Sequence, residues 1–253
     1  MSNRTSRAFG IEFFLGTKKQ LLNIISSGFD KPYSYIVTPN IDHVVQLQHN
    51  EELRYAYQKA SYRICDSRIL VPLLRSLNVD VSEVIPGSDL TVTLLEKAEL
   101  ERLSIVLIGA AEEDVAKLRV TYPNVRIAHY NPPMGFIKRE AEIEKCIRFI
   151  LDHPSDLILY AVGAPRQEVL ASRLKAEQRT GVGLCVGASI LFATGSLKRA
   201  PVWMQKAHLE WLHRMLSEPQ RLIRRYFYDA IHILPLYLKE RTRRSRVTAE
   251  STD

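Results

Sequence analysis

The sequence contains little cysteine and no long apolar stretch. Its three cysteines, Cys65, Cys146 and Cys185, are widely separated. Their odd number excludes a closed disulfide framework and their spacing matches no metal-binding motif, so we expect a reducing compartment. No stretch approaches 18 consecutive apolar residues, and the amino-terminal MSNRTSRAFG lacks the apolar centre of a signal peptide. We therefore predict neither a membrane-spanning helix nor secretion.

Two motifs of nucleotide-dependent enzymes are also missing. No G-x-G-x-x-G follows a strand-like segment, which argues against a dinucleotide-dependent oxidoreductase or epimerase. No D-x-D falls where a strand is expected to end, because Asp80 in NVDVSE has no acidic partner at that spacing. Arginines and backbone N–H groups would then have to neutralise any phosphate that the protein binds.

The composition is that of an ordinary soluble globular protein, with 46% hydrophobic and 25% charged residues. Its 253 residues suffice for one sizeable domain, or for one domain and an appendage. The net charge of +7 is uneven: residues 198–246 hold twelve Lys or Arg and four acidic residues, whereas residues 1–197 are nearly neutral. This asymmetry indicates an anionic partner near the C-terminal region, which could be nucleic acid, a membrane surface or a phosphorylated ligand.

Short apolar segments alternate with amphipathic ones through the first 200 residues. Such alternation predicts a Rossmann-like α/β fold, with a mostly parallel sheet and helices on both faces. Strands are expected at Tyr33–Thr38, Tyr62–Cys65, Ser104–Gly109, Val125–Tyr130, Leu157–Gly163 and Val182–Gly187. Helices are expected at about 41–60, 67–77, 88–102, 112–121, 139–152 and 165–179.

The pattern changes near residue 200 and becomes helical, except around Pro219 and Pro235. One apolar helix face has residues spaced by three, four and seven: Leu209, Leu212, Leu216, Ile223, Phe227 and Ala230. Arg214, Arg221 and Arg225 form a different stripe. We predict a catalytic core at residues 1–200, a basic helical appendage at 201–240 that contacts the membrane and the active site, and a disordered basic tail at 241–253.

Polar residues gather where the strands are expected to end, which is where open parallel sheets bind ligands. The candidates are Thr38, Asn40 and Asp42 after the first strand, Asp66 after the second, Gly109 in IGAAEED after the third, and Arg166 and Gln167 in VGAPRQE after the fifth. A glycine at such a turn lets the backbone approach a ligand. A helix that begins at Gly109 could hold a phosphate at its N-terminus.

Each of these residues also has a purely structural interpretation. Thr38, Asn40 and Asp66 are good helix N-caps. The segment around Pro165 has residues that favour the start of a helix, and no ligand is needed to explain them. His43 could be structural or catalytic, and the C-terminal arginines could form a solvated face. The convergence of so many polar groups at one predicted edge favours a site.

Taken in order, TPNIDHVV, Asp66, PGSDL, VGAPRQE, GSLKRAP and LEWLHRMLSEPQRLIRRY resemble the WecG/TagA/CpsF glycosyltransferases, glycosyltransferase family 26. The resemblance runs from about residue 10 to about residue 230. It implies an inverting, metal-independent transferase without a cofactor, which moves a sugar from a UDP-sugar donor to a polyprenyl-diphosphate-sugar acceptor for cell-surface polysaccharide. It also implies a peripheral location on the cytoplasmic face of the bacterial membrane, reached through the appendage.

The resemblance assigns roles to individual residues. Asp66 matches the catalytic base, although Ser67 stands where the family usually has glycine. Thr38 and Asn40 match the T-x-N of the sugar-nucleotide site, and Arg166 and Gln167 match the G-x-P-[KR]-Q-E motif. The diphosphate-binding arginines match Arg214, Arg221 and Arg224. Two family residues are absent: Val84 and Ile85 replace an arginine before PGSDL, and VGASILF lacks the usual aspartate.

Other functions remain open from the sequence alone. The basic C-terminus could bind nucleic acid, but the aliphatic residues between its arginines and the nearly neutral core argue against this, so we predict no nucleic-acid partner. A non-catalytic nucleotide-sugar-binding protein on the same fold is a further alternative. A homo-oligomer is possible, and the apolar face of the appendage could then pack on another subunit or on the core rather than on a membrane.

Overall fold

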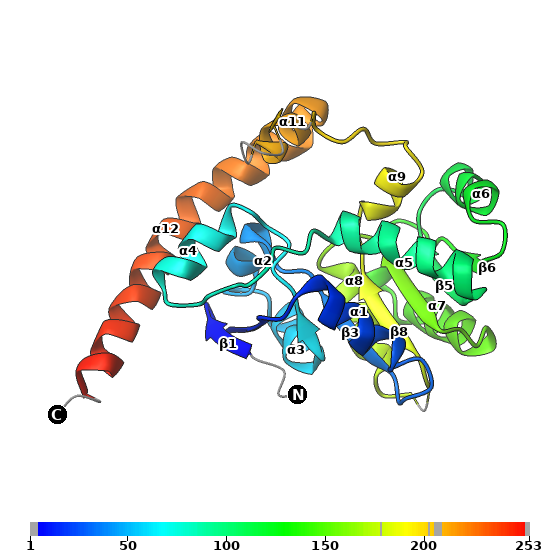
Figure 1. Ribbon diagram of the computed structural model, residues 1–253, viewed down its shortest axis with the longest axis horizontal. Helices are drawn as coiled ribbons and strands as arrows, with labels where there is room; N and C mark the ends of the chain where they lie inside the picture. The colour runs from blue at the N-terminus through cyan, green and yellow to red at the C-terminus, as the bar shows by residue number, and fades with distance from the viewer. Residues whose placement is uncertain (1–4, 178, 202, 205–208, 251–253) are drawn as a thin grey trace.

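The computed structural model describes residues 5–177, 179–201, 203–204 and 209–250, with side chains as far as Ser245. In these ranges, six parallel strands form one sheet in the order β4-β3-β8-β7-β5-β6 (Figure 1). This confirms the predicted α/β class. The strands are β3 (Ser34–Val37), β4 (Tyr62–Arg63), β5 (Ser104–Gly109), β6 (Arg126–Tyr130), β7 (Leu157–Ala161) and β8 (Val182–Cys185).

Helices cover both faces of the sheet, because alternate side chains of each strand point to opposite faces and both sets are apolar. Tyr35 and Val37 pack on one side, whereas Ile36 packs on the other. The first face is covered by α2 (Ile41–Gln46), α3 (Glu51–Lys59), α4 (Leu70–Ser76), α7 (Glu140–Asp152) and α8 (Arg166–Leu174). The second is covered by α1 (Lys18–Ser26), α5 (Gly87–Glu101), α6 (Glu112–Thr121) and α9 (Ser189–Ala193).

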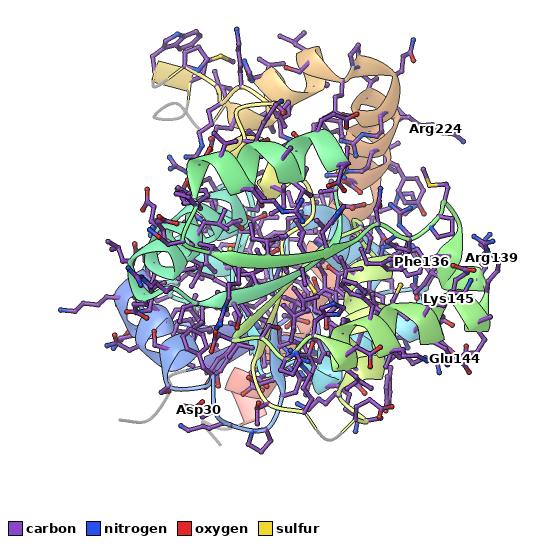
Figure 2. The ribbon with its side chains drawn as sticks, turned by 90° about the vertical axis from the view of Figure 1, so that its right-hand side faces the viewer. Asp30, Phe136, Arg139, Glu144, Lys145 and Arg224 are labelled. Atoms are coloured by element: carbon purple, nitrogen blue, oxygen red, sulfur yellow. The ribbon has the colours of Figure 1, made fainter. Side chains whose placement is uncertain are left out.

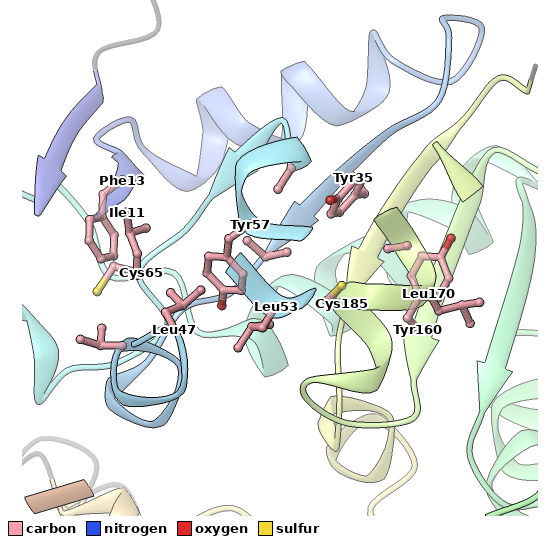
Figure 3. Packing of buried hydrophobic residues seen from close by; sticks show 14 of the residues in the cluster. Ile11, Phe13, Tyr35, Leu47, Leu53, Tyr57, Cys65, Tyr160, Leu170 and Cys185 are labelled. Carbon is pink, nitrogen blue, oxygen red and sulfur yellow. The ribbon is translucent and has the colours of Figure 1, made fainter. Parts of the chain in front are cut away.

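Figure 2 shows α7, which carries the labelled Glu144 and Lys145, lying along one side of the sheet. A short 3₁₀ helix, η1 (Phe136–Lys138), precedes it. The core on this face contains tyrosines as well as aliphatic residues (Figure 3). The hydroxyls of Tyr33 and Tyr160 lie 2.8 Å apart, so a hydrogen bond between them compensates for the burial of these two polar groups.

The amino-terminal hairpin was not predicted. Its strands, β1 (Thr5–Ala8) and β2 (Ile11–Phe14), are antiparallel and joined by Phe9 and Gly10, both with positive φ. Two positive φ values suit a tight hairpin turn, but a phenylalanine gives no signal for one. The expected helix at 41–60 is also wrong as a single element, because Asn50 caps a separate α3 by accepting a hydrogen bond from the Leu53 N–H.

The C-terminal region consists of α11 (Glu210–Ser217) and the long α12 (Pro219–Glu250), which crosses α2 and runs beside α4 (Figure 1). Pro219 is the first residue of α12, and Pro235 lies inside the helix. Leu222 is fully buried, and the hydroxyl of Ser76 donates to that of Tyr237. No helix in the described ranges combines the length and hydropathy needed to cross a bilayer.

The expected disordered tail after residue 240 is wrong as far as Glu250, because α12 continues to that residue. Side-chain contacts explain the continuation. The Arg244 guanidinium donates to the Leu77 carbonyl at 2.6 Å and to the Arg7 carbonyl, and it pairs with the buried Glu240. Residues 251–253 of the expected tail, and 202 and 205–208 of the expected appendage, lie outside the described residues.

Candidate active site

A cavity of about 1010 Å³ lies at the carboxyl edge of the sheet. The turns after β3, β4, β5, β7 and β8 line one side, and α11 and α12 line the other. Parallel strands bring all their carboxyl ends to one edge, and the appendage adds the facing wall. The predicted site residues that line this cavity are Thr38, Asn40, Asp66, Arg166, Gln167, Arg214 and Arg221.

Asp66 is the central carboxylate of the cavity. The N–H of Gly87, the first residue of α5, donates to Asp66 Oδ1, and the Asp66 N–H donates to the Pro39 carbonyl. A Cβ atom on Gly87 would lie 3.6 Å from both Asp66 Oδ1 and Ser189 Oγ. Burial raises the pKa of Asp66 to about 6, although the Gly87 N–H, His43 and Arg214 act in the opposite direction. The PGSDL motif thus holds Asp66 through the start of a helix.

Asn40 both caps a helix and lines the cavity. Its side chain caps α2 by accepting from the His43 N–H at 3.2 Å, while His43 Nδ1 accepts from the Asn40 N–H at 3.3 Å. The same residue lines the cavity. Thr38 donates to the Cys185 carbonyl at 3.4 Å, so it joins the ends of β3 and β8 rather than capping a helix.

Gln167 lines the cavity but is only 3% exposed, and both ends of its amide are bonded within the protein. Its Oε1 accepts from the Gly187 N–H at 2.9 Å and its Nε2 donates to Glu168 Oε1 at 2.8 Å. The amide therefore shapes the turn after β8. Arg166, next to it, is partly buried and lies with Nη1 3.6 Å from the Met134 sulfur.

A buried ionisable pair adjoins the cavity: His43 lines it, and Glu168 lies outside its lining. His43 Nε2 is 3.6 Å from Glu168 Oε1, and both side chains are almost fully buried. Burial alone would lower the pKa of His43, but the hydrogen bond and charge of Glu168 outweigh it and raise this pKa. Sequence reasoning left His43 undecided and gave Glu168 no role beyond the start of a helix.

Four arginines belong to the appendage, and the structure separates them. Arg214 stacks 5.7 Å from the Phe192 ring, and Arg221 pairs with Glu218 at 2.7 Å. Arg225 lies between Asp42 at 3.7 Å and Asp229 at 4.0 Å. Burial, followed by the nearby Asp42, raises the pKa of Asp229 to about 6.

The structure does not bring Arg224 to the cavity with the other predicted site residues, because it is exposed and does not line the cavity. Figure 2 shows it extending outward from α12. Arg221 and Arg225 are four residues apart on one face of the helix and both line the cavity, whereas Arg224 is exposed outside it. The buried Leu222 and Asp229 identify the inner face of α12, but the sequence alone does not show that these two residues are buried.

Gly109 also lies outside the cavity lining, although its neighbour Ala110 belongs to it. With φ at +95°, a Cβ atom on Gly109 would lie 2.8 Å from the Ala161 backbone. The glycine is therefore required by close packing of β5 against β7. Its carbonyl lies 3.0 Å from His129 Nε2.

The cysteines are all buried and free. Within the described ranges, no group of three or more His, Cys, Asp or Glu side chains could hold a metal ion. Metal independence remains a prediction for the assay below. Five carboxylates (Asp42, Asp66, Glu210, Glu218 and Asp229) and several guanidinium groups line the cavity. This combination suits proton transfer next to a phosphorylated substrate.

A cavity at the carboxyl edge of a parallel α/β sheet is where open α/β proteins bind their ligands. Comparison with known proteins agrees. Residues 6–247 match the model of the glycosyl transferase WecG/TagA/CpsF family, and the chain belongs to this family. It is a glycosyltransferase.

Two relatives carry the name N-acetylglucosaminyldiphosphoundecaprenol N-acetyl-beta-D-mannosaminyltransferase. The protein from Bacillus spizizenii is 26% identical over 192 residues, which cover 74% of this chain and 73% of the relative. The protein from Staphylococcus aureus is 28% identical over 220 residues, which cover 84% of this chain and 85% of the relative.

The raised pKa of Asp66 predicts a cost in stability above pH 6. The folded chain keeps the Asp66 proton up to about pH 6, against 3.8 ordinarily, so stability falls as pH rises through this window. Asparagine can accept the same Gly87 hydrogen bond without a charge. We expect Asp66→Asn to raise the Tm at pH 8, by roughly 2–4 °C per kcal/mol, and the gain to vanish near pH 4. Thermal unfolding from pH 4 to 8 measures this. The exposed Asp80→Asn is the control, and an Asp66→Asn variant with a lower Tm at pH 8 would contradict the assignment.

The positions of Arg221 and Arg224 predict unequal effects on turnover. Arg221→Ala removes a guanidinium that lines the cavity, and we expect kcat/KM to fall by roughly 10- to 100-fold, as for the loss of a hydrogen bond to a charged group. Arg224→Ala removes the same charge from the outer surface and should change kcat/KM by less than about twofold. Steady-state kinetics on both variants, with Tm as the folding control, separates a local contact from a general effect of charge. Equal losses would contradict the structure.

Proposed function

We propose that this enzyme transfers a sugar, with inversion, from a UDP-sugar to a polyprenyl-diphosphate-linked sugar, and that Asp66 is the general base. The observation that carries the proposal is the position of Asp66. It is the carboxylate held by the start of α5, in a cavity whose other wall supplies Arg214 and Arg221. With a pKa of about 6, Asp66 is ionised at neutral pH and is a stronger base than an ordinary aspartate.

The chemistry requires one proton transfer and one departing phosphate. The acceptor hydroxyl oxygen bonds to the anomeric carbon of the donor sugar while Asp66 takes its proton. The bond from that carbon to the UDP oxygen breaks on the opposite face, and the electron pair leaves with UDP. Arg214 and Arg221 then stabilise the negative charge that develops on the β-phosphate. Thr38 and Asn40 would contact the donor from the wall formed after β3.

The names of the relatives supply the first substrates to test. They point to N-acetylmannosamine as the transferred sugar and to N-acetylglucosaminyl-diphospho-undecaprenol as the acceptor. The absent family arginine makes a panel of donors necessary, because Ile85 is buried and offers no cation in its place. Cell-wall or capsular polymer synthesis is the process that such a product would serve.

The decisive measurement is UDP release with EDTA present, from a panel of UDP-sugars that includes UDP-N-acetylmannosamine and a short-chain polyprenyl-diphosphate-N-acetylglucosamine acceptor. We expect the wild type to turn over and Asp66→Asn to lose roughly 10²- to 10⁴-fold in kcat, the usual value of general-base help. Asp80→Asn should match the wild type. Equal release from Asp66→Asn would remove Asp66 from the mechanism, and activity that EDTA abolishes would overturn metal independence.

We further propose that α12 contacts the cytoplasmic face of the membrane. Its outer side carries an apolar stripe in which every side chain is more than half exposed: Ile223, Phe227, Ile231, Leu234 and Leu238. The spacing by three and four places them on one helix face. The exposed Arg224, Lys239 and Arg241 lie along the same helix. An amphipathic helix of this kind lies in the interface, with cations near anionic headgroups.

Vesicle binding tests this contact. We expect the wild type to sediment with phosphatidylglycerol vesicles more than with phosphatidylcholine vesicles. The double variant Phe227→Asp with Leu234→Asp should lose at least about tenfold in affinity, because each apolar side chain is worth about 1.5–3 kcal/mol when buried. Val120→Asp, at an exposed apolar position on α6, is the matched control. If the double variant binds vesicles normally but changes the oligomeric state, the stripe is a subunit interface instead.

A further inference from the structure

Glu168 is a buried carboxylate that the proposed mechanism does not use. It is 0% exposed and is absent from the cavity lining. One of its oxygens, Oε1, accepts from Gln167 Nε2 at 2.8 Å and lies 3.6 Å from His43 Nε2. Its other oxygen has no hydrogen-bond partner among the described residues. A single buried oxygen thus serves two cavity residues that come from different helices, α8 and α2.

The orientation of both partners follows from their other hydrogen bonds. The Gly187 N–H can only donate, so Gln167 must turn its oxygen to Gly187 and its NH₂ group to Glu168. The Asn40 N–H likewise donates to His43 Nδ1, so the neutral imidazole carries its proton on Nε2, which faces Glu168. Gln167 therefore needs an acceptor at the position of Glu168 Oε1. His43 Nε2 has no hydrogen-bond partner among the described residues and faces the same oxygen at 3.6 Å.

These bonds reach two walls of the cavity. Through Gln167, Glu168 is linked to the turn at Gly187, where φ is +52°. Through His43, it is linked to Asn40 and the start of α2. The carboxylate lies in the first turn of α8, where the helix dipole favours a negative charge. A buried charge is costly, and here its surroundings supply one hydrogen bond from Gln167, the nearby His43 ring and a helix dipole.

We propose that Glu168 is a positioning residue for the transfer: its buried carboxylate orients Gln167 and His43, and through them holds the turn after β8 and the start of α2 in the arrangement that binds the UDP part of the donor. The inference rests on the proposed function. Glu168 does not touch the substrate, and it acts only through residues that line the cavity.

Two substitutions separate positioning from packing. Glu168→Met fills a similar volume but removes the acceptor, so it should weaken UDP binding by roughly tenfold or more, the size expected when hydrogen bonds to a charged group are lost. Glu168→Gln keeps an acceptor oxygen for both donors and should stay within about threefold of the wild type. Glu177→Gln, an exposed glutamate just after α8, is the control for charge. Calorimetric titration with UDP gives the Kd, and thermal unfolding verifies the fold. Equal Kd values for Glu168→Met and wild type would overturn the proposal.

An NMR titration of the His43 ring tests the link without any activity. The charged groups that face this ring are Glu168 on α8, Asp42 on α2, Arg225 and Asp229 on α12 and Asp66 after β4. Tyr57 on α3 lies against it. Because Glu168 raises the pKa of His43, the titration midpoint should fall in Glu168→Gln and in Glu168→Met and stay unchanged in Glu177→Gln. An unchanged midpoint in all three variants would overturn the link. If the midpoint falls but UDP binds neither the wild type nor any variant, the proposed donor is wrong and the link between His43 and Glu168 is still supported.

A second pair of variants covers the case in which Glu168→Met does not fold. His43→Gln can keep the hydrogen bond from the Asn40 N–H and turn an NH₂ group toward Glu168, because glutamine at this position of a helix completes a capping box, as Gln20 does with Thr17 in α1. His43→Leu restores neither. We expect His43→Gln to keep UDP affinity and His43→Leu to lose roughly tenfold. Equal affinities of the two variants would overturn the proposal.

Discussion

The strands of this sheet are apolar on both faces, and this constraint governs the rest of the structure. Such a sheet is stable only when helices cover both sides, and parallel strands then need a helical crossover between one strand and the next. Every crossover returns the chain to the same edge, so the turns after β3, β4, β5, β7 and β8 all open toward one cavity. By driving the strands into the core, the hydrophobic effect also gathers at this edge the polar side chains that the core cannot hold.

The cavity concentrates charges that are costly to the fold. Asp66 and Asp229 both have raised pKa values because burial disfavours their ionised forms. Each is offset in part by a nearby donor: Gly87 N–H for Asp66, and Arg225 for Asp229. A general base gains strength from the same burial that destabilises its charge, so a cost in folding free energy becomes an advantage in proton transfer.

The long helix α12 of the appendage has two faces of different character. Its inner face holds Arg221, Arg225 and the buried Leu222, and it closes the cavity against α2. Its outer face holds the exposed apolar stripe. Under the proposed function, this one helix would bring the enzyme to the membrane surface and the diphosphate of the lipid-linked acceptor to the arginines. The end of α12 is tied to the core through Arg244, which fixes the helix relative to α4 and β1.

The sequence by itself determined the α/β class, the basic helical C-terminus and the identity of most candidate residues, because apolar periodicity and strand-end chemistry are local properties. It also contained the family resemblance that the comparison with known proteins confirmed. It did not predict the hairpin at Phe9 and Gly10, the break before Asn50 or the continuation of α12 past residue 240. These depend on contacts between residues far apart in the chain, as when Arg244 reaches Leu77.

Tertiary structure alone decided which side chains meet. It put Arg221 and Arg225 on the inner face of α12 and Arg224 outside, and it showed Gly109 to be a packing residue. It also joined His43 to Glu168, 125 positions later in the chain, across two helices. Helix rotation and burial set these relations, and both depend on how one element packs on another, which the local pattern of residues does not encode.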